Sequence, residues 1–417
     1  MPLSVKLLLV SLCSFLVSCG DSKNNSPENV SSVENNIKVI TENATSVAPE
    51  LGSFGIDLSH QDPNIRPGDD FFRFTNGRWL DSYELPADRS NYGSFSVLSD
   101  RSDERIRTII TDLTAIEPTQ NSMEQKIGDY YLSYMNTDAL NTLGISPLLP
   151  GLSQLANVDT SAELIIAFGR ASIDTTASPL IFNISADRSN PDRHQLNIAV
   201  GGISLPDRDY YLEDTEQYLN VREEYRSHIK RTLDFAQIED SAKKADAVLD
   251  VETRIAKHIW PRADRRNRDL TYNPMSYKKF QSLYLGFDWD SYFASAGIEN
   301  LQDLNVYYPS AMSPVIDLIA TIPVKNWNSY MTYHYISNNA NVLSEEINKE
   351  HFYFYSTVLK GVPEQRARWE RGVARVGALS SLGEAVGQIY VERHFPESAK
   401  QQMNGLVENL RAALAQS

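Results

Sequence analysis

The amino-acid sequence predicts a mainly α-helical protein with one β-hairpin. Most segments between residues 102 and 414 repeat apolar residues with a period of about 3.6, the spacing of an amphipathic helix. Two neighbouring segments, residues 179–185 and 195–200, instead alternate with a period of about two across a loop of turn-forming residues. The composition, 41% hydrophobic and 22% charged in 417 residues, is ordinary for a globular protein and leaves room for about two or three domains.

The first 18 residues have the pattern of a signal peptide. One cation, Lys6, precedes the apolar run from Leu7 to Val17, which is too short to span a bilayer. The residues Leu16-Val17-Ser18-Cys19 are also typical of a bacterial lipobox, in which cleavage leaves Cys19 as a lipidated N-terminus. The alternative is an ordinary secretory signal with an incidental cysteine, but the polar stretch that follows favours lipidation.

Residues 19–53 are predicted to be a polar tether. They are rich in Asn, Ser and Glu and lack sustained periodicity, so they cannot bury enough apolar surface to fold. With lipidation at Cys19, this predicts a chain at the cell envelope that is anchored to a membrane and faces the periplasm or the exterior. The formal charge of −15 and the absence of a basic run argue against a nucleic-acid partner. Because the only other cysteine, Cys13, precedes the cleavage point, no disulfide is expected.

Residues 54–100 are predicted to form an N-terminal arm around an aromatic segment. Asp69 or Asp70 can cap a short helix whose apolar face holds Phe71, Phe72 and Phe74. Asn76-Gly77 is predicted to end this helix before Trp79. Such aromatic residues usually dock a helix end in a core, and a ligand site is the alternative interpretation.

Residues 101–417 are predicted to form one helical domain. Ser122 to Gln125 form a capping box for the second helix, and Pro147, Pro150 and Gly151 are predicted to interrupt the chain. The predicted helical segments are 102–113, 122–134, 161–168, two within 216–259, 277–296, 314–322, 324–343, 382–395 and 398–414.

Two charged segments are interpreted as structural. Leu205 to Tyr211 is predicted to be a buried turn in which Arg208 is satisfied by the aspartates on either side of it. The basic cluster from Arg262 to Arg268 is predicted to be a solvated turn, with a contact to a substrate carboxylate or a lipid headgroup as the alternative.

Three stretches resemble the neprilysin and endothelin-converting-enzyme family of zinc metallopeptidases. They are Pro67, Asp70-Phe71-Phe72, Gly77, Trp79, Pro86 and Tyr92 to Phe95; then Leu205 to Tyr211; then Arg368-Trp369 with Leu382 to Phe395. The resemblance covers the chain from about Gly55 to its end. It implies that residues 101–417 are the helical cap domain of the peptidase N-terminal region, and that the arm packs on a catalytic domain that this chain lacks. The parent function it implies is zinc-dependent hydrolysis of oligopeptides at the cell envelope.

The zinc site of such an enzyme is not found in the sequence. A zincin needs two histidines one helical turn apart with a glutamate between them. The seven histidines are His60, His194, His228, His258, His334, His351 and His394, and none begins a His-Glu-x-x-His motif. We therefore assign no catalytic residue and no metal ligand, and we expect the chain alone to bind no zinc and to be inactive.

The resemblance also implies where a cap would meet its substrate. In the family, an arginine before Tyr-Gly meets the terminal carboxylate of the peptide, and a second arginine follows a Phe-x-x-Leu pattern. Those positions are Asn91 and Ser99 here, so both charges are absent. We predict Asn91, with Arg89 or Arg101 as the substitute cation, as the substrate-binding residues, because arginine pairs with carboxylates in a bidentate manner. The competing hypothesis is a non-catalytic envelope lipoprotein that binds a peptide or protein partner.

Overall fold

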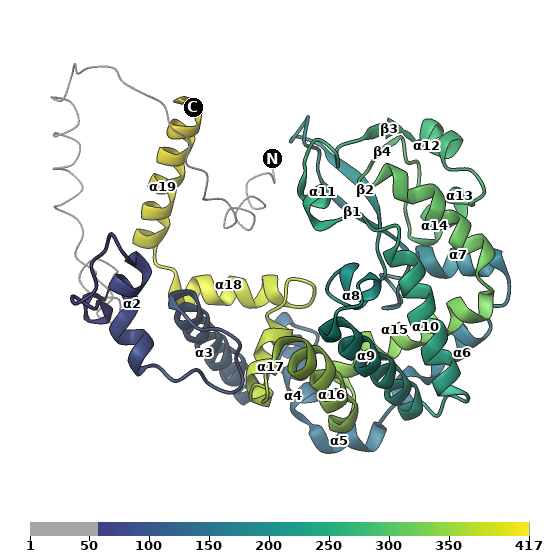
Figure 1. Cartoon of the computed structure of the whole chain (residues 1–417). Helices are drawn as coiled ribbons and strands as arrows, with labels where there is room; N and C mark the ends of the chain where they lie inside the picture. Colours follow the sequence, from purple (N-terminus) through teal and green to yellow (C-terminus); the bar gives the residue numbers. More distant parts are fainter. Residues whose placement is uncertain (1–56, 417) are drawn as a thin grey trace. The chain divides into compact units, whose positions relative to one another are not determined.

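The structure is a computed structural model that describes residues 57–416 (Figure 1). The chain divides into two compact units, an N-terminal unit that ends at Glu84 and a main unit that begins at Leu85. The signal peptide, Cys19 and the tether lie outside the described residues. Among residues 57–416, no helix is both long enough and apolar enough to cross a membrane.

The described part of the N-terminal unit consists of the short helix η2 (Leu58–His60) and the helix α2 (Phe71–Ser82). Asp70 caps α2 by accepting a hydrogen bond from the backbone N–H of Arg73 at 2.8 Å, as predicted. The predicted helix end at Asn76-Gly77 is wrong, because α2 continues to Ser82. Gly77 serves close packing instead: a Cβ atom there would lie 2.6 Å from the Cβ atom of Asp62.

The main unit is mainly helical, as predicted. Its first helices are α3 (Ser94–Ala115), α4 (Met123–Met135), α5 (Thr137–Leu143), η3 (Ser146–Leu148), α6 (Leu149–Ala156), α7 (Ser161–Gly169), α8 (Asp209–Leu212), α9 (Glu216–Phe235), α10 (Ser241–Ala256) and α11 (Arg262–Arg266). The later ones are α12 (Tyr277–Leu283), α13 (Trp289–Ser295), α14 (Pro309–Thr321), α15 (Val324–Asn339), η4 (Ala340–Val342), α16 (Glu345–Phe352), the π-helix η5 (Tyr353–Val358), α17 (Arg368–Val376), α18 (Gly383–His394) and α19 (Glu397–Gln416). Pro147 and Pro150 do not interrupt the helical structure but lie in the first turns of η3 and α6. At these positions the backbone N–H that proline lacks is not needed for a hydrogen bond within the helix.

A small four-stranded sheet holds the predicted hairpin. Strands β1 (Leu180–Ala186) and β2 (His194–Val200) pair antiparallel, with Leu180 opposite Val200. The strand β4 (Asp303–Val306) pairs parallel to β2, and β3 (Pro274–Ser276) pairs antiparallel to β4, so that the order is β1-β2-β4-β3. The hairpin is confirmed, whereas β3 and β4 were not predicted because three or four residues are too few to show alternation.

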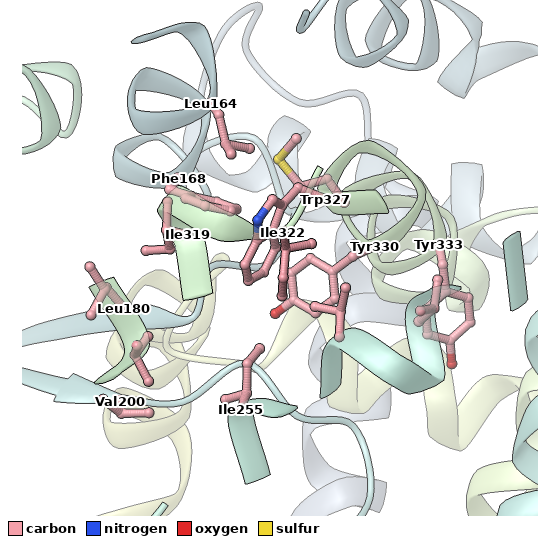
Figure 2. Packing of buried hydrophobic residues seen from close by; sticks show 14 of the residues in the cluster. Leu164, Phe168, Leu180, Val200, Ile255, Ile319, Ile322, Trp327, Tyr330 and Tyr333 are labelled. Atoms are coloured by element: carbon pink, nitrogen blue, oxygen red, sulfur yellow. The ribbon is translucent and has the colours of Figure 1, made fainter. Parts of the chain in front are cut away.

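The larger of two hydrophobic clusters lies between the sheet and the helices α7, α9, α10, α13 and α15. Figure 2 shows Trp327 of α15 in this cluster, with Phe168, Ile322 and Tyr330 around it. Trp327 meets Phe168 edge-on, with ring centroids 5.2 Å apart, which is a favourable geometry for aromatic pairs. The aromatic segment of the N-terminal arm differs from this core, because Phe71 and Phe72 are 67% and 65% exposed. The predicted docking of that segment in a core is therefore not found for these two residues.

The second cluster joins the beginning of the main unit to its end. Its buried members lie on α3, α4, α17 and α18: Ile109, Ile110, Leu113, Ile127, Val373, Val376 and Val386. Gly372 lets α17 approach α4, since a Cβ atom there would lie 2.9 Å from the ring of Tyr131. By contrast, the predicted apolar stripe of α19 contains no buried residue.

A buried carboxylate, Glu252 of α10, organises the polar part of the larger cluster. Its side chain is 0% exposed and accepts hydrogen bonds from the hydroxyl groups of Tyr211 at 2.6 Å and Tyr225 at 3.0 Å. The Ser204 hydroxyl donates to the same carboxylate at 3.0 Å, and the Nε2 atom of His334 lies 2.8 Å from it. The carboxylate therefore ties α8, α9 and α15 to α10.

The segment Leu205 to Tyr211 is a turn that runs into α8, with Leu205, Asp207 and Tyr211 buried. Arg208 lies 3.9 Å from the adjacent Asp209, as predicted, but the other partners of the two charged side chains lie in distant segments. Arg208 donates to the backbone carbonyl of Ile259. The buried Asp207 accepts hydrogen bonds from Arg262 at 2.9 Å and Arg265 at 2.8 Å. Both arginines therefore neutralise a buried carboxylate more than 50 residues away in the sequence. The prediction of a solvated cluster is wrong for Arg265, whose side chain is 28% exposed, whereas the side chain of Arg262 is 60% exposed.

Candidate functional site

A pocket of about 550 Å³ lies between the start of α3, with the residues just before it, and the segment from the end of α16 to α17. Two parts of the chain line it, and both belong to the main unit. The first contributes Asp88, Arg89, Ser90, Asn91, Phe95, Ser96 and Ser99, and the second contributes Phe352, Ser356, Lys360, Val362, Gln365, Arg366 and Arg371.

Local structure fixes both walls of this pocket. The backbone N–H of Glu364 donates to the carbonyl of Ala87 at 3.3 Å, which joins the two parts of the chain. The buried side chain of Asn348 accepts hydrogen bonds from Gln365 at 2.8 Å and from Arg371 at 2.9 Å. One polar residue therefore positions two lining side chains.

Two of the four lining cations are paired with carboxylates, among them Asp88, which lies 3.7 Å from Arg89 and lines the pocket itself. Arg89, whose side chain is only 12% exposed, forms an ion pair with Asp100 at 2.9 Å. Burial acts to lower the pKa of Arg89, but the hydrogen bond and charge of Asp100 outweigh burial and raise it. Arg366 lies 4.0 Å from Asp100 and 3.9 Å from Asp103. Arg89 and Arg366 thus have their charges largely balanced.

The other two lining cations have no carboxylate within ion-pair distance in the described part of the chain. They are Arg371 of α17 and Lys360, which precedes the turn at Gly361. Burial lowers the pKa of Arg371, since half-buried surroundings oppose its charge. Asp88 is the one carboxylate among the lining residues, so the pocket has an excess of positive charge.

A cluster of titratable groups adjoins the pocket through α16. His351 and Glu350 directly precede the lining residue Phe352. Glu350 contacts the Nδ1 atom of the buried His228 at 2.8 Å and the guanidinium group of Arg231 at 2.9 Å. Burial lowers the pKa of His351 to about 4, and it also lowers the pKa of His228 despite Glu350. Both histidines are therefore held neutral near pH 7.

The pocket contains two of the three predicted substrate-binding residues, Arg89 and Asn91, together with Ser99. Arg101 is not among its lining residues. The resemblance could not reveal Lys360, Arg366 and Arg371, because they are about 270 residues away in the sequence; the arginine-rich run from Arg366 to Arg371 was the available signal. No contact with a substrate tests the predicted roles, which stay predictions.

The described residues do not fit a zinc ion. Within residues 57–416, no group of three or more His, Cys, Asp or Glu side chains is arranged to hold a metal. The expectation that this chain binds no zinc stays a prediction, and no chemical step is assigned to a metal here.

The mainly helical fold with its small sheet is that of the N-terminal part of zinc metallopeptidases. The solved structure of the Mycobacterium tuberculosis zinc metalloprotease Zmp1 in complex with an inhibitor has a TM-score of 0.79 and 34% identity, covering 86% of this chain and 54% of that chain. PepO from Lactobacillus rhamnosis HN001 shares the fold, with a TM-score of 0.71 and 19% identity, covering 84% of this chain and 55% of that chain.

Curated relatives agree with the structural similarity. Human endothelin-converting enzyme 1 is 24% identical over 381 residues, covering 86% of this chain and 48% of the enzyme. Neprilysin-2 of Drosophila melanogaster is 26% identical over 383 residues, covering 85% of this chain and 49% of the relative. The N-terminal model of peptidase family M13 matches residues 67–417. The chain belongs to peptidase family M13, which confirms the predicted resemblance, and it spans about half the length of the curated relatives it matches.

Proposed function

We propose that this chain is the substrate-cap part of a neprilysin-like zinc metalloendopeptidase that hydrolyses oligopeptides at the cell envelope. The observation that carries the proposal is the similarity to a zinc metalloprotease, with 34% identity and a TM-score of 0.79 over 86% of this chain. Because residues 57–416 do not fit zinc, the metal would be held elsewhere in the enzyme. It would supply the activated water for hydrolysis.

The contribution of this chain would be to bind and orient the peptide. Arg371 and Lys360 are the cations of the pocket that have no carboxylate of residues 57–416 within ion-pair distance, so they are suited to bind a peptide carboxylate. The Asn91 amide and the Ser99 hydroxyl line the same pocket and can donate further hydrogen bonds. Arg89 is a positioning residue in this scheme, since it is held by Asp100.

A second candidate is a non-catalytic envelope lipoprotein that binds a peptide or protein partner. It is favoured by the sequence Leu16 to Cys19 and by the lack of a His-Glu-x-x-His motif in the chain. In this case the pocket would be the binding site, and no hydrolysis would follow.

The reading frame after the codon for Ser417 separates the two candidates. An open frame that encodes His-Glu-x-x-His, and whose product binds zinc and cleaves peptides, supports the peptidase. A stop codon directly after Ser417 supports the binding protein.

The 417-residue chain should meanwhile hold no stoichiometric zinc after dialysis and should not cleave a quenched peptide mixture. Metal analysis by mass spectrometry and a fluorescence assay measure the two properties. One tightly held zinc per chain would overturn the assignment of the metal site to another part of the enzyme.

A further inference from the structure

The charge distribution of the pocket distinguishes a ligand with one carboxylate from a ligand with two. Arg89 and Arg366 have carboxylates of the protein beside them, namely Asp100 and Asp103. Lys360 and Arg371 have no carboxylate within 4 Å in residues 57–416. A ligand with two carboxylates can pair with both of these cations, whereas a ligand with one carboxylate can pair with only one of them.

The two cations differ in how they are held. The Arg371 guanidinium donates to the Asn348 side chain, and its Nε–H donates to the carbonyl of Arg366 at 3.1 Å, so its orientation is fixed. Lys360 is exposed and lies on a turn where Gly361 adopts a φ of +69°. A fixed arginine favours the geometry of one carboxylate, whereas a lysine on a flexible stem can reach a second carboxylate at a variable distance.

The walls of the pocket suit the aliphatic part of an acidic residue. Phe95, which is 84% exposed, and Phe352 lie among the lining residues. The volume of about 550 Å³ exceeds what one carboxylate group fills and accommodates a whole terminal residue. A terminal glutamate or aspartate carries its α-carboxylate and its side-chain carboxylate a few bonds apart.

We propose that this pocket selects peptides whose C-terminal residue is acidic, with Arg371 binding one carboxylate and Lys360 binding the other. The inference rests on the proposed function, because it takes the ligand to be a peptide. It assigns Lys360 and Arg371 as the residues that determine specificity at this end of the peptide.

The test is direct binding of labelled peptides to the 417-residue chain, followed by fluorescence anisotropy. Three fluorescein-labelled hexapeptides share one sequence and end in Glu, in Gln, or in Glu with an amidated C-terminus. The peptide with both carboxylates should bind at least about tenfold more tightly than either of the others, which is about 1.4 kcal/mol. Equal affinity for the three peptides would overturn the proposal.

Two variants and one control assign the residues. Lys360→Ala should abolish the preference for Glu over Gln, and because Lys360 is exposed on a turn, this variant should fold. Arg371→Lys keeps the charge but loses the two parallel N–H donors of the guanidinium group. It should therefore weaken the binding of both peptides that end in Glu. Lys325→Ala, an exposed lysine at the start of α15 that does not line the pocket, should leave all three affinities unchanged. A preference that survives both pocket variants would overturn the assignment.

Three further outcomes separate the alternatives. Inorganic phosphate that displaces the Glu-ended peptide at equal concentration would show an unspecific anion site and would overturn the selection of acidic residues. If the selective binding is found but the frame after Ser417 encodes no zinc motif, the proposed hydrolysis fails and the peptide specificity stands. If an active enzyme shows no terminal preference, the specificity fails and the proposed function stands.

Discussion

The replacement Glu252→Ala removes an acceptor that four side chains share. The carboxylate accepts from Tyr211 at 2.6 Å, from Tyr225 at 3.0 Å and from Ser204 at 3.0 Å, and it lies 2.8 Å from His334. In the variant these polar groups of α8, α9, α15 and the turn before α8 would face an apolar cavity.

The expected cost follows from the number of groups left unsatisfied. A buried donor without an acceptor costs about 1–3 kcal/mol, and breaking a buried charged network costs about 3–5 kcal/mol. We therefore expect Glu252→Ala to lower the free energy of unfolding by about 3–6 kcal/mol, out of a typical total of about 5–15 kcal/mol. Glu252→Gln keeps one acceptor oxygen at the same volume, so its cost should be smaller, about 1–3 kcal/mol.

Urea unfolding at pH 7 and 25 °C, followed by far-ultraviolet circular dichroism, measures these differences. Glu239→Ala is the matched control, because Glu239 is exposed in the turn before α10; its effect should stay within about 0.5 kcal/mol. A loss of less than about 1 kcal/mol for Glu252→Ala, with an unchanged dependence on urea, would refute the reasoning. It would mean that the four groups find other partners.

Three further predictions concern pH, lipidation and the N-terminal unit. Because burial lowers the pKa of His351 to about 4 from an unfolded value of 6.5, the unfolded state binds the proton first as the pH falls. The free energy of unfolding should therefore be highest above about pH 6.5 and decrease by up to about 3 kcal/mol toward pH 4. In the His351→Gln variant, urea unfolding should show a smaller decrease over the same pH range. Cys19→Ala should move the protein from the detergent-requiring membrane fraction to the soluble fraction; a wild-type protein that is soluble and unacylated would contradict lipidation. Phe71 and Phe72 are 67% and 65% exposed, so amide exchange should be fast in residues 57–79 and slow in α10; uniform slow exchange would show that the N-terminal unit is stable by itself.

The helices of the main unit were predictable because each buries a stripe of side chains with helical spacing. Ile106, Ile109, Ile110 and Leu113 illustrate this, since the last three are buried on α3. The end of α2 was not predictable, because Asn76-Gly77 has the local chemistry of a helix end. In the folded chain α2 continues past Gly77, which packs closely against Asp62.

The candidate site was predictable only in part, for the same reason. The family pattern around Tyr92 pointed to Arg89 and Asn91, which line the pocket. Nothing in the local sequence relates them to Lys360 and Arg371, because sequence patterns report neighbours along the chain rather than in space. Glu252 lies on the apolar face of its helix, and its partners Tyr211 and His334 come from distant segments.

The second hydrophobic cluster has a consequence for synthesis on the ribosome. Ile109 and Ile127 of α3 and α4 are buried against Val373 and Val386, which follow about 250 residues later. At about 5–20 residues per second, the first two helices would remain without their partners for roughly 10–50 s. Their apolar faces are then available to a chaperone, and pausing of translation before α17 should increase aggregation of the nascent chain.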